Sequence, residues 1–165
     1  MESEDIHIRI GHSPDPDDAF MFHALTTGAM ETPGRHYEHV LLDIQTLNEK
    51  ALNSEYEISA VSIHSFPKII ENYALMNCGA SMGEGYGPML IGNEQLTSQE
   101  AKSRTIAVPG LDTSAYLALR LAWGEVDVEV VPFDEILPSV SEGKYDVGLI
   151  IHEGQLTWKD EGVYL

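Results

Sequence analysis

Cysteine, basic side chains and long apolar runs are scarce in this sequence. Cys78 is the single cysteine among 165 residues, so no disulfide can form within the chain. Lysine and arginine together number 9 against 27 aspartate and glutamate residues, which gives a formal net charge of −18. An acidic surface of this kind repels nucleic acid and anionic membranes, and we therefore expect neither as a partner.

Segments that would direct the chain into a membrane or out of the cell are not recognisable in the sequence. No apolar run approaches the roughly 20 residues that a membrane-spanning helix requires. The opening residues, MESEDIHIRI, are acidic, whereas a signal peptide begins with a basic segment followed by an apolar one. We therefore expect a cytoplasmic protein whose acidity serves solubility.

Apolar segments of strand length alternate with helical patterns along the chain. Ile6, Ile8 and Ile10 alternate with polar residues, as in a strand with one buried face. Residues 147–151 are uniformly apolar, as in a strand covered on both faces. This alternation predicts an α/β fold with mainly parallel sheets. Further strands are expected at residues 39–42, 58–63, 74–76, 88–91, 105–108 and 126–131, and helices at residues 16–27, 44–52, 66–70, 115–123 and 135–141, with Asp15, Asp43 and Asp134 as N-caps.

A polar stretch at residues 92–103 separates two halves that each show this alternation. We place the division there and predict a first lobe of residues 1–92 and a second lobe of residues 93–165. Ligands of parallel sheets bind at the carboxyl ends of the strands. Residues 11–18, 62–66, 109–114 and 152–155 fall at such ends, so we expect them to form a cleft that holds a small polar organic molecule.

The loop at residues 109–114 enters a helix directly. Free backbone N–H groups and the hydroxyls of Thr113 and Ser114 would suit a carboxylate or another electron-rich oxygen. The alternative is an ordinary helix cap, in which Asp112 or Thr113 satisfies the first turn.

Ser13 and Ser62 follow two other strands. The acidic residues after Ser13 suit the hydroxyl groups of a sugar-like ligand or a metal ion, although no partner metal ligand stands at a diagnostic spacing. The alternative is that these acidic residues only cap the helix and complement its dipole. Ser62 is either a turn residue or a ligand contact.

His152 directly follows the most apolar strand, at the point where the sheet meets the cleft. An unperturbed histidine pKa near 6.5 suits a general base at neutral pH. The alternative is a histidine that only forms a hydrogen bond to a loop. We predict that His152 is the reactive group.

Taken together, these motifs resemble the 1,4-dihydroxy-6-naphthoate synthase family, which belongs to the futalosine route to menaquinone. The resemblance extends along nearly the whole chain and in the same order. The residues that carry it are 13–20 (SPDPDDAF), 61–62 (VS), 83–88 (GEGYGP), 108–110 (VPG), 113–116 (TSAY), 136–138 (ILP) and 148–153 (GLIIHE).

The resemblance implies a type II periplasmic-binding-protein-like fold of two lobes with a ligand cleft between them. It also implies a lyase that converts cyclic dehypoxanthine futalosine to 1,4-dihydroxy-6-naphthoate by base-initiated carbon–carbon cleavage, without a metal or organic cofactor. His152 occupies the position of the base. The positions implied to bind substrate are Ser13, Ala60, Val61, Ser62, Thr113 and Ser114.

The sequence departs from the family pattern at several of these motif positions. The usual first loop reads Ser-Pro-Cys-Pro-Asn-Asp-Thr-Phe, whereas Asp15, Asp17 and Ala19 replace the cysteine, asparagine and threonine here. The family often has lysine where this chain has Ala60, so we expect one positive contact to the substrate carboxylate to be missing. These changes predict a shifted substrate preference.

Members of the family continue appreciably beyond the position that matches Leu165. The resemblance therefore implies that a C-terminal part, which completes the second lobe and returns to the first, is missing. We expect low stability alone, or a homodimer or partner chain that completes the fold. The alternatives to an enzyme are a cytoplasmic module that binds a small carboxylate without catalysis, and an inactive fragment.

Overall fold

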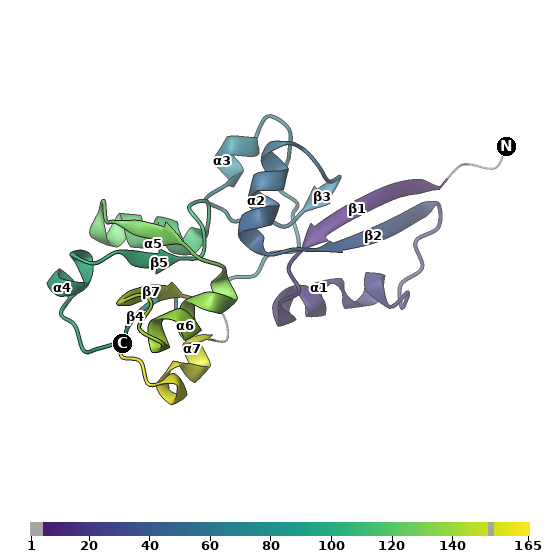
Figure 1. Cartoon of the computed structure of the whole chain (residues 1–165). Coiled ribbons are helices and arrows are strands. Elements are labelled where there is room, and N and C mark those ends of the chain that lie inside the picture. The colour runs from purple at the N-terminus through teal and green to yellow at the C-terminus, as the bar shows by residue number, and fades with distance from the viewer. Residues whose placement is uncertain (1–4, 152–153) are drawn as a thin grey trace. The chain divides into compact units, whose positions relative to one another are not determined.

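The computed structural model describes residues 5–151 and 154–165, and the chain divides into two compact units at residues 82/83 (Figure 1). The first unit contains β1 (Ile6–His12), α1 (Pro16–Thr26), β2 (Arg35–Leu41), α2 (Ile44–Leu52), β3 (Ile58–Ser59) and α3 (Phe66–Ile69). The second contains β4 (Met89–Gly92), α4 (Ser98–Lys102), β5 (Ile106–Val108), α5 (Ser114–Trp123), β6 (Val128–Val130), α6 (Phe133–Ser141), β7 (Val147–Ile150), α7 (Gly154–Thr157) and the 3₁₀ helix η1 (Trp158–Glu161).

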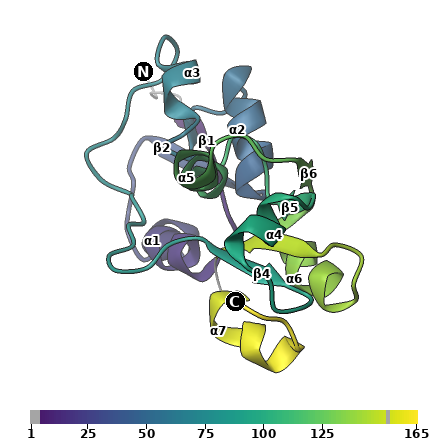
Figure 2. The ribbon, with the colours of Figure 1, turned by 90° about the vertical axis from the view of Figure 1, so that its left-hand side faces the viewer.

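The sheet of the first unit is parallel, with the order β2-β1-β3. β1 pairs with β2 along its whole length, whereas β3 pairs with β1 only through Ile58 and Ser59. Helices α1 and α2 lie on opposite sides of this sheet (Figures 1 and 2). The predicted strand at residues 58–63 is therefore shorter than expected, because the chain turns away after two paired residues.

Local signals set the helices of the first unit. Asp43 caps α2 by accepting a hydrogen bond from the backbone N–H of Thr46, as predicted, and α2 buries Leu47, Asn48 and Ala51. Asp15 occupies the predicted N-cap position of α1, with a proline at the start of the helix, but its side chain forms no capping hydrogen bond. These two helix starts hold the loops that follow β1 and β2 in place.

The sheet of the second unit has the order β4-β7-β5-β6. β5 is parallel to both β6 and β7, and β4 runs antiparallel to β7. One face packs on α6 through Ile136 and Val140, and the other packs on α5 through Ala115 and Leu119 (Figures 1 and 2). The unbroken apolar run of β7 is thus covered on both faces, as the sequence predicted.

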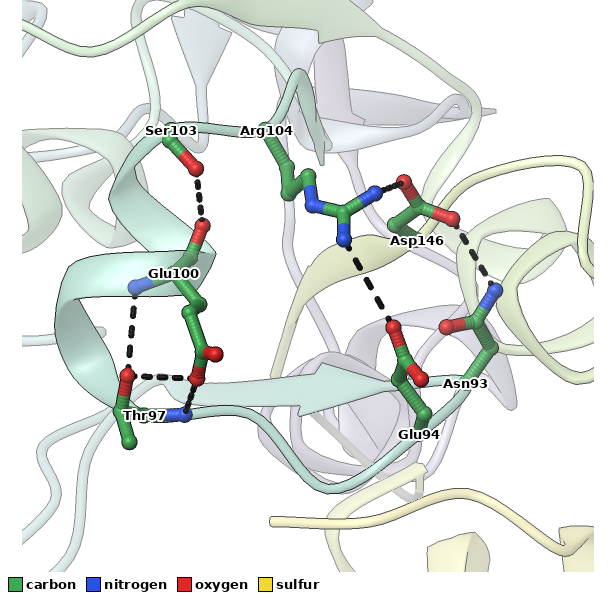
Figure 3. A network of polar contacts seen from close by, with 7 residues as sticks. All are labelled: Asn93, Glu94, Thr97, Glu100, Ser103, Arg104 and Asp146. Carbon is green, nitrogen blue, oxygen red and sulfur yellow. Dashed lines mark hydrogen bonds and ion pairs between the residues drawn. The ribbon is translucent and has the colours of Figure 1, made fainter.

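A polar network closes the edge of this second sheet where β5 and β7 begin (Figure 3). The guanidinium of Arg104 lies 2.7 Å from an Asp146 oxygen and 3.6 Å from Glu94, and the side-chain amide of Asn93 donates to Asp146 at 3.2 Å. Thr97 and Glu100 form a reciprocal capping box at the start of α4. This edge is occupied by its own ion pairs and lies opposite the carboxyl ends of β5 and β7.

Several sequence-based expectations differ from the structure. The division falls at 82/83 instead of 92/93, because β4 pairs with β7 and so lies in the sheet of the second unit. Residues 74–76 do not form the predicted strand. Asp134 lies inside α6, whose N-cap is Pro132, so its predicted capping role is wrong. Among the residues that the structure describes, no helix is long and apolar enough to cross a membrane.

Candidate functional site

In the first unit, the predicted substrate-binding residues gather where β1 and β3 end. The two strands are parallel neighbours, and the Ala60 N–H continues their pairing by donating to the Gly11 carbonyl at 2.8 Å. Ser13 directly follows β1, while Ala60, Val61 and Ser62 follow β3. The structure therefore brings these predicted residues to one edge of one sheet.

Ser13 is buried and is held by hydrogen bonds from the loop that follows it. Its N–H donates to an Asp18 oxygen at 2.7 Å, and its Oγ accepts from the Asp15 N–H at 3.2 Å. Burial raises the pKa of the Asp18 carboxyl, and the hydrogen bond from Ser13 opposes that rise. Asp18 thus acts on the backbone of Ser13 from inside α1, a contact that the sequence did not predict.

Ser62 is clamped by Asn48, a fully buried residue of α2. The side-chain NH₂ of Asn48 donates to Ser62 Oγ at 3.1 Å, and its carbonyl oxygen accepts from the Ser62 N–H at 2.8 Å. Because Oγ accepts this bond, the hydroxyl hydrogen of Ser62 can be donated to a ligand. Sequence reasoning missed Asn48, although a polar residue between Leu47 and Ala51 on the buried face of a helix was the available signal.

His12 is a second residue that sequence reasoning missed. It ends β1, directly before Ser13, and its side chain is 2% exposed. Its ring contacts His39 of β2 and the Ser13 carbonyl. The side chains of Asp18 and His12 therefore contact the two backbone groups of Ser13, its N–H and its carbonyl.

In the second unit, Thr113 and Ser114 lie at the start of α5, in the loop that follows β5. The Thr113 hydroxyl donates to the Gly110 carbonyl at 2.8 Å and accepts from the Tyr116 N–H at 3.2 Å. The helix cap considered as the alternative is therefore present at Thr113. Ser114 is half-buried, and substrate contacts for both residues stay predictions.

β7 ends beside this loop, because β5 and β7 are parallel neighbours. His152 follows two residues after Ile150, the last residue of β7, and lies outside the described residues. Its predicted role as a base stays a prediction. After it, Gln155 of α7 donates to the Gly87 carbonyl at 2.6 Å, which ties α7 to the glycine-rich segment before β4.

Two hollows lie in the second unit, and none of the described residues that line them is a predicted site residue. One, of about 210 Å³, is lined entirely by apolar side chains, among them Leu90, Leu119 and Trp123. The other, of about 160 Å³, reaches Gly92 and Tyr164. An apolar lining does not suit a polar substrate, so the first hollow is not a better candidate site than the strand ends. The second hollow also contains the polar residues Glu94 and Ser98, but none of the residues that the sequence predicted to bind substrate. Within the described residues, no group of three or more His, Cys, Asp or Glu side chains is placed to hold a metal ion.

Comparison with known proteins gives a consistent relationship. A family model described as menaquinone biosynthesis matches residues 8–165. The chain is 38% identical to 1,4-dihydroxy-6-naphthoate synthase of Thermus thermophilus over 157 residues, and 36% identical to the protein of the same name from Streptomyces coelicolor over 165 residues. These matches cover 94% and 95% of this chain but 56% and 57% of the relatives. The chain therefore spans little more than half the length of the curated relatives it matches.

Solved structures confirm the predicted fold. A crystal structure of a protein from Archaeoglobus fulgidus shares 42% identity with a TM-score of 0.89, and the match covers 99% of this chain and 60% of that one. The aliphatic sulphonate binding protein of Escherichia coli has a TM-score of 0.63 at 15% identity, covering 97% and 59% of the two chains. A likeness at such low identity shows a periplasmic-binding-protein type of α/β fold and no function.

Proposed function

Because the chain belongs to the menaquinone biosynthesis family, we propose that it carries the catalytic residues of a cytoplasmic lyase that forms 1,4-dihydroxy-6-naphthoate from cyclic dehypoxanthine futalosine. The observation that carries this proposal is 36–38% identity, over nearly the whole chain, to two proteins named for that product. Placement of hydroxyl-bearing residues at the carboxyl ends of adjacent parallel strands supports it, since ligands of such sheets bind there.

The proposed reaction begins at His152. As a general base, it removes a proton from a hydroxyl group of the sugar-derived ring. The alkoxide becomes a carbonyl while the adjacent carbon–carbon bond breaks, and the electron pair of that bond passes into the ring system that becomes aromatic. Aromatisation supplies the driving force, and the sugar-derived fragment leaves. No metal or organic cofactor takes part in this proposal.

The remaining predicted residues bind and orient the substrate. In the first unit, Ser62 donates its hydroxyl hydrogen while Asn48 holds its oxygen. In the second, backbone N–H groups at the start of α5, next to Thr113 and Ser114, stabilise a substrate carboxylate. Ala60 and Val61 line the same strand end as Ser62, and the side chain of Ala60 supplies no positive charge.

Turnover of cyclic dehypoxanthine futalosine by the purified protein tests the proposal. His152→Ala is expected to lower kcat by about 10²- to 10⁴-fold, the usual contribution of a general base. His23→Ala, which changes an exposed histidine of α1, is the control and is expected to leave kcat unchanged. An unchanged rate in His152→Ala would show that His152 is not the base. Tight binding of a small carboxylate without any turnover would instead favour a binding module.

The proposed working form is an assembly, either a homodimer or a complex with a partner chain that completes the fold. Support comes from large apolar side chains on the surface, such as Phe20 at 86% and Leu121 at 78% exposure. Light scattering is expected to give a mass above that of one chain. A strictly monomeric protein at all concentrations would contradict this proposal.

A further inference from the structure

A pair of histidines lies directly behind Ser13, between the sheet of the first unit and α1. His12 ends β1, and His39 lies on the neighbouring strand β2. Phe22 of α1 stacks on the His12 ring, with 4.3 Å between ring centroids, and meets His39 edge-on at 6.0 Å. Phe22 therefore covers both rings, of which His12 is buried and His39 half-buried, and three elements set the geometry of the pair.

The hydrogen bonds of the pair fix where its protons lie. His12 Nδ1 is 2.9 Å from the Ser13 carbonyl oxygen, which can only accept, so Nδ1 carries the hydrogen. In a neutral His12 ring, Nε2 then accepts, and the atom that faces it at 3.0 Å, His39 Nδ1, must donate. Both rings are therefore Nδ1–H tautomers. His39 Nε2 is left as a bare acceptor, buried and without a hydrogen-bond partner among the described residues.

A charged pair would break this arrangement. If His39 were protonated, its buried Nε2 would carry an N–H group that no described residue accepts. If His12 were protonated, its Nε2–H would donate to His39 Nδ1. A neutral His39 would then carry its hydrogen on Nε2, the buried atom that has no described partner. A buried donor without an acceptor is costly and rare in proteins.

The charged surroundings of the pair are limited. Burial, followed by repulsion from His12, lowers the pKa of His39. Asp18 is the carboxylate that acts on His12 from α1, and it is already bonded to the Ser13 N–H. Two neighbouring acidic residues have other partners: Glu38 of β2 lies against His7, and Glu57, just before β3, pairs with Arg9. Both the lowered pKa and the absence of a described acceptor for Nε2 therefore favour a neutral His39 ring.

We propose that His12 and His39 are positioning residues for Ser13: as two neutral Nδ1–H rings in series, they hold its carbonyl while Asp18 holds its amide. The inference rests on the proposed function, in which Ser13 contacts the substrate. Holding both ends of the Ser13 backbone fixes the direction of its Cα–Cβ bond, and the hydrogen bond from the Asp15 N–H then holds Oγ. Neither histidine touches the reacting atoms, so their effect on the reaction passes through Ser13.

The tautomers provide a test that needs no activity. Long-range ¹H–¹⁵N NMR of the histidine side chains near pH 7.5 distinguishes a protonated Nδ1 from a protonated Nε2. We expect the resonances of His12 and His39 to show hydrogen on Nδ1 in both rings, whereas the exposed His23 serves as the reference for a solvent-exposed ring. Hydrogen on Nε2 of either ring would overturn the proposal.

Substitutions at His39 test the effect on the site. His39→Asn retains a donor close to the position of Nδ1, whereas His39→Leu removes it. We expect His39→Leu to shift the Ser13 amide resonance and to lower kcat/KM by about tenfold, the low end of the loss when a residue that orients a functional group is removed. His39→Asn is expected to recover most of both effects, and His36→Leu, at an exposed position of β2, is the control.

The outcomes separate this proposal from the proposed function. Equal effects of His39→Leu and His39→Asn on the Ser13 resonance would overturn the positioning role, because only one of them removes the donor. If His39→Leu does not fold, the tautomers of the unsubstituted protein still decide. Absence of turnover in the unsubstituted protein contradicts the proposed function, while the NMR measurements continue to decide the role of the pair.

Discussion

The two units share one architecture, a sheet between helices with polar loops at the carboxyl ends of parallel strands, but their interiors differ. Among the described residues, the second unit buries two apolar clusters, and its buried polar residues are Thr113 and Ser139. The first unit buries the apolar residues Ile10, Leu47, Ala51 and Ile69 together with the polar residues His12, Ser13, Asp18, Asn48 and Ser65. Packing therefore shapes the second unit, whereas directional hydrogen bonds shape the edge of the first unit where β1 and β3 end.

Removing apolar volume from the second unit is the largest expected effect. Ile136 of α6 is 1% exposed, so Ile136→Ala is expected to lower the free energy of unfolding by about 2–5 kcal/mol. Chemical denaturation measures the loss. Gln99→Ala, at an exposed position of α4, is the control and is expected to change stability by less than about 0.5 kcal/mol. Similar losses for both variants would mean that Ile136 does not belong to a packed core.

The stability costs of substituting one strand glycine in each unit allow the two units to be compared directly. A Cβ on Gly148 would lie 2.7 Å from Ile136 Cγ2, a stiff β-branched side chain, and a Cβ on Gly11 would lie 2.7 Å from Leu47 Cδ2 and 2.8 Å from the Tyr56 ring. Gly148→Ala is expected to cost about 1–3 kcal/mol. Gly11→Ala is expected to cost less, because the Leu47 terminus and the half-buried Tyr56 can move. A larger cost at Gly11 would reverse the comparison.

The hydrogen bonds between Asn48 and Ser62 in the first unit can be tested by substitution. Asn48→Ala removes both hydrogen bonds to Ser62 and leaves the Ser62 N–H without its acceptor, at a cost of about 1–3 kcal/mol. Amide hydrogen exchange at Ser62 is expected to accelerate. Asn53→Ala, at the exposed end of α2, is the control. Unchanged exchange at Ser62 would mean that Asn48 does not hold this residue.

The histidine pair predicts a pH dependence for the first unit. Because burial lowers the pKa of His39, the unfolded chain binds a proton at a higher pH than the folded chain does. The contribution of His39 to the free energy of unfolding is therefore expected to be largest above about pH 6.5 and to fall as the pH decreases through its lowered pKa. Denaturation at pH 7.5 and pH 5.5 measures this fall, and His39→Asn is expected to reduce it. An increase in stability on acidification over this range would contradict a neutral buried ring.

The smallest expected effect belongs to an exposed ion pair. The Arg9 guanidinium binds both carboxylate oxygens of Glu57, at 2.7 and 3.0 Å, and lowers the pKa of Glu57 to about 2. This contribution is present above the ordinary glutamate pKa and is lost as the pH falls through about 2. The two side chains are 41% and 45% exposed and so are screened by solvent, and Glu57→Gln is therefore expected to cost about 1 kcal/mol or less. NMR titration of the Glu57 carboxyl measures the pKa, and a value near 4.5 would contradict the pairing.

Elements with local signals were predictable from the sequence. Asp43 and the α2 pattern gave the bounds of that helix, since the cap and the buried positions lie within one segment. α4 was missed although Thr97 and Glu100 have capping-box spacing. The end of β3 after Ser59 and the absence of a strand at residues 74–76 depend on whether a partner strand is in reach, which no local pattern encodes.

The candidate site likewise has residues that the sequence predicted and residues that it did not. The strand-end rule places Ser13 and Ser62 at one edge, because it needs only the order and direction of the strands. Asn48 meets Ser62 across 14 residues of sequence, and His12 meets His39 across 27. Such pairs depend on strand register and on which helix face is buried. A pattern of apolar residues therefore predicts that Ser13 and Ser62 lie at one edge of the sheet, but it does not predict which side chains form hydrogen bonds there.

The strand order of the second unit has a consequence for how the chain is made. β7 lies between β4 and β5 in the sheet, yet it is the last of these strands in the sequence. On the ribosome, β1, β2 and β3 can pair as soon as Ser59 has emerged. β4 can pair with β7 only after the chain has been made as far as Ile150. Until then the unpaired backbone N–H and C=O groups of β4, together with its apolar side chains, are exposed to other nascent or folded chains. The second half of this protein is therefore the part for which translation speed and chaperone protection matter most.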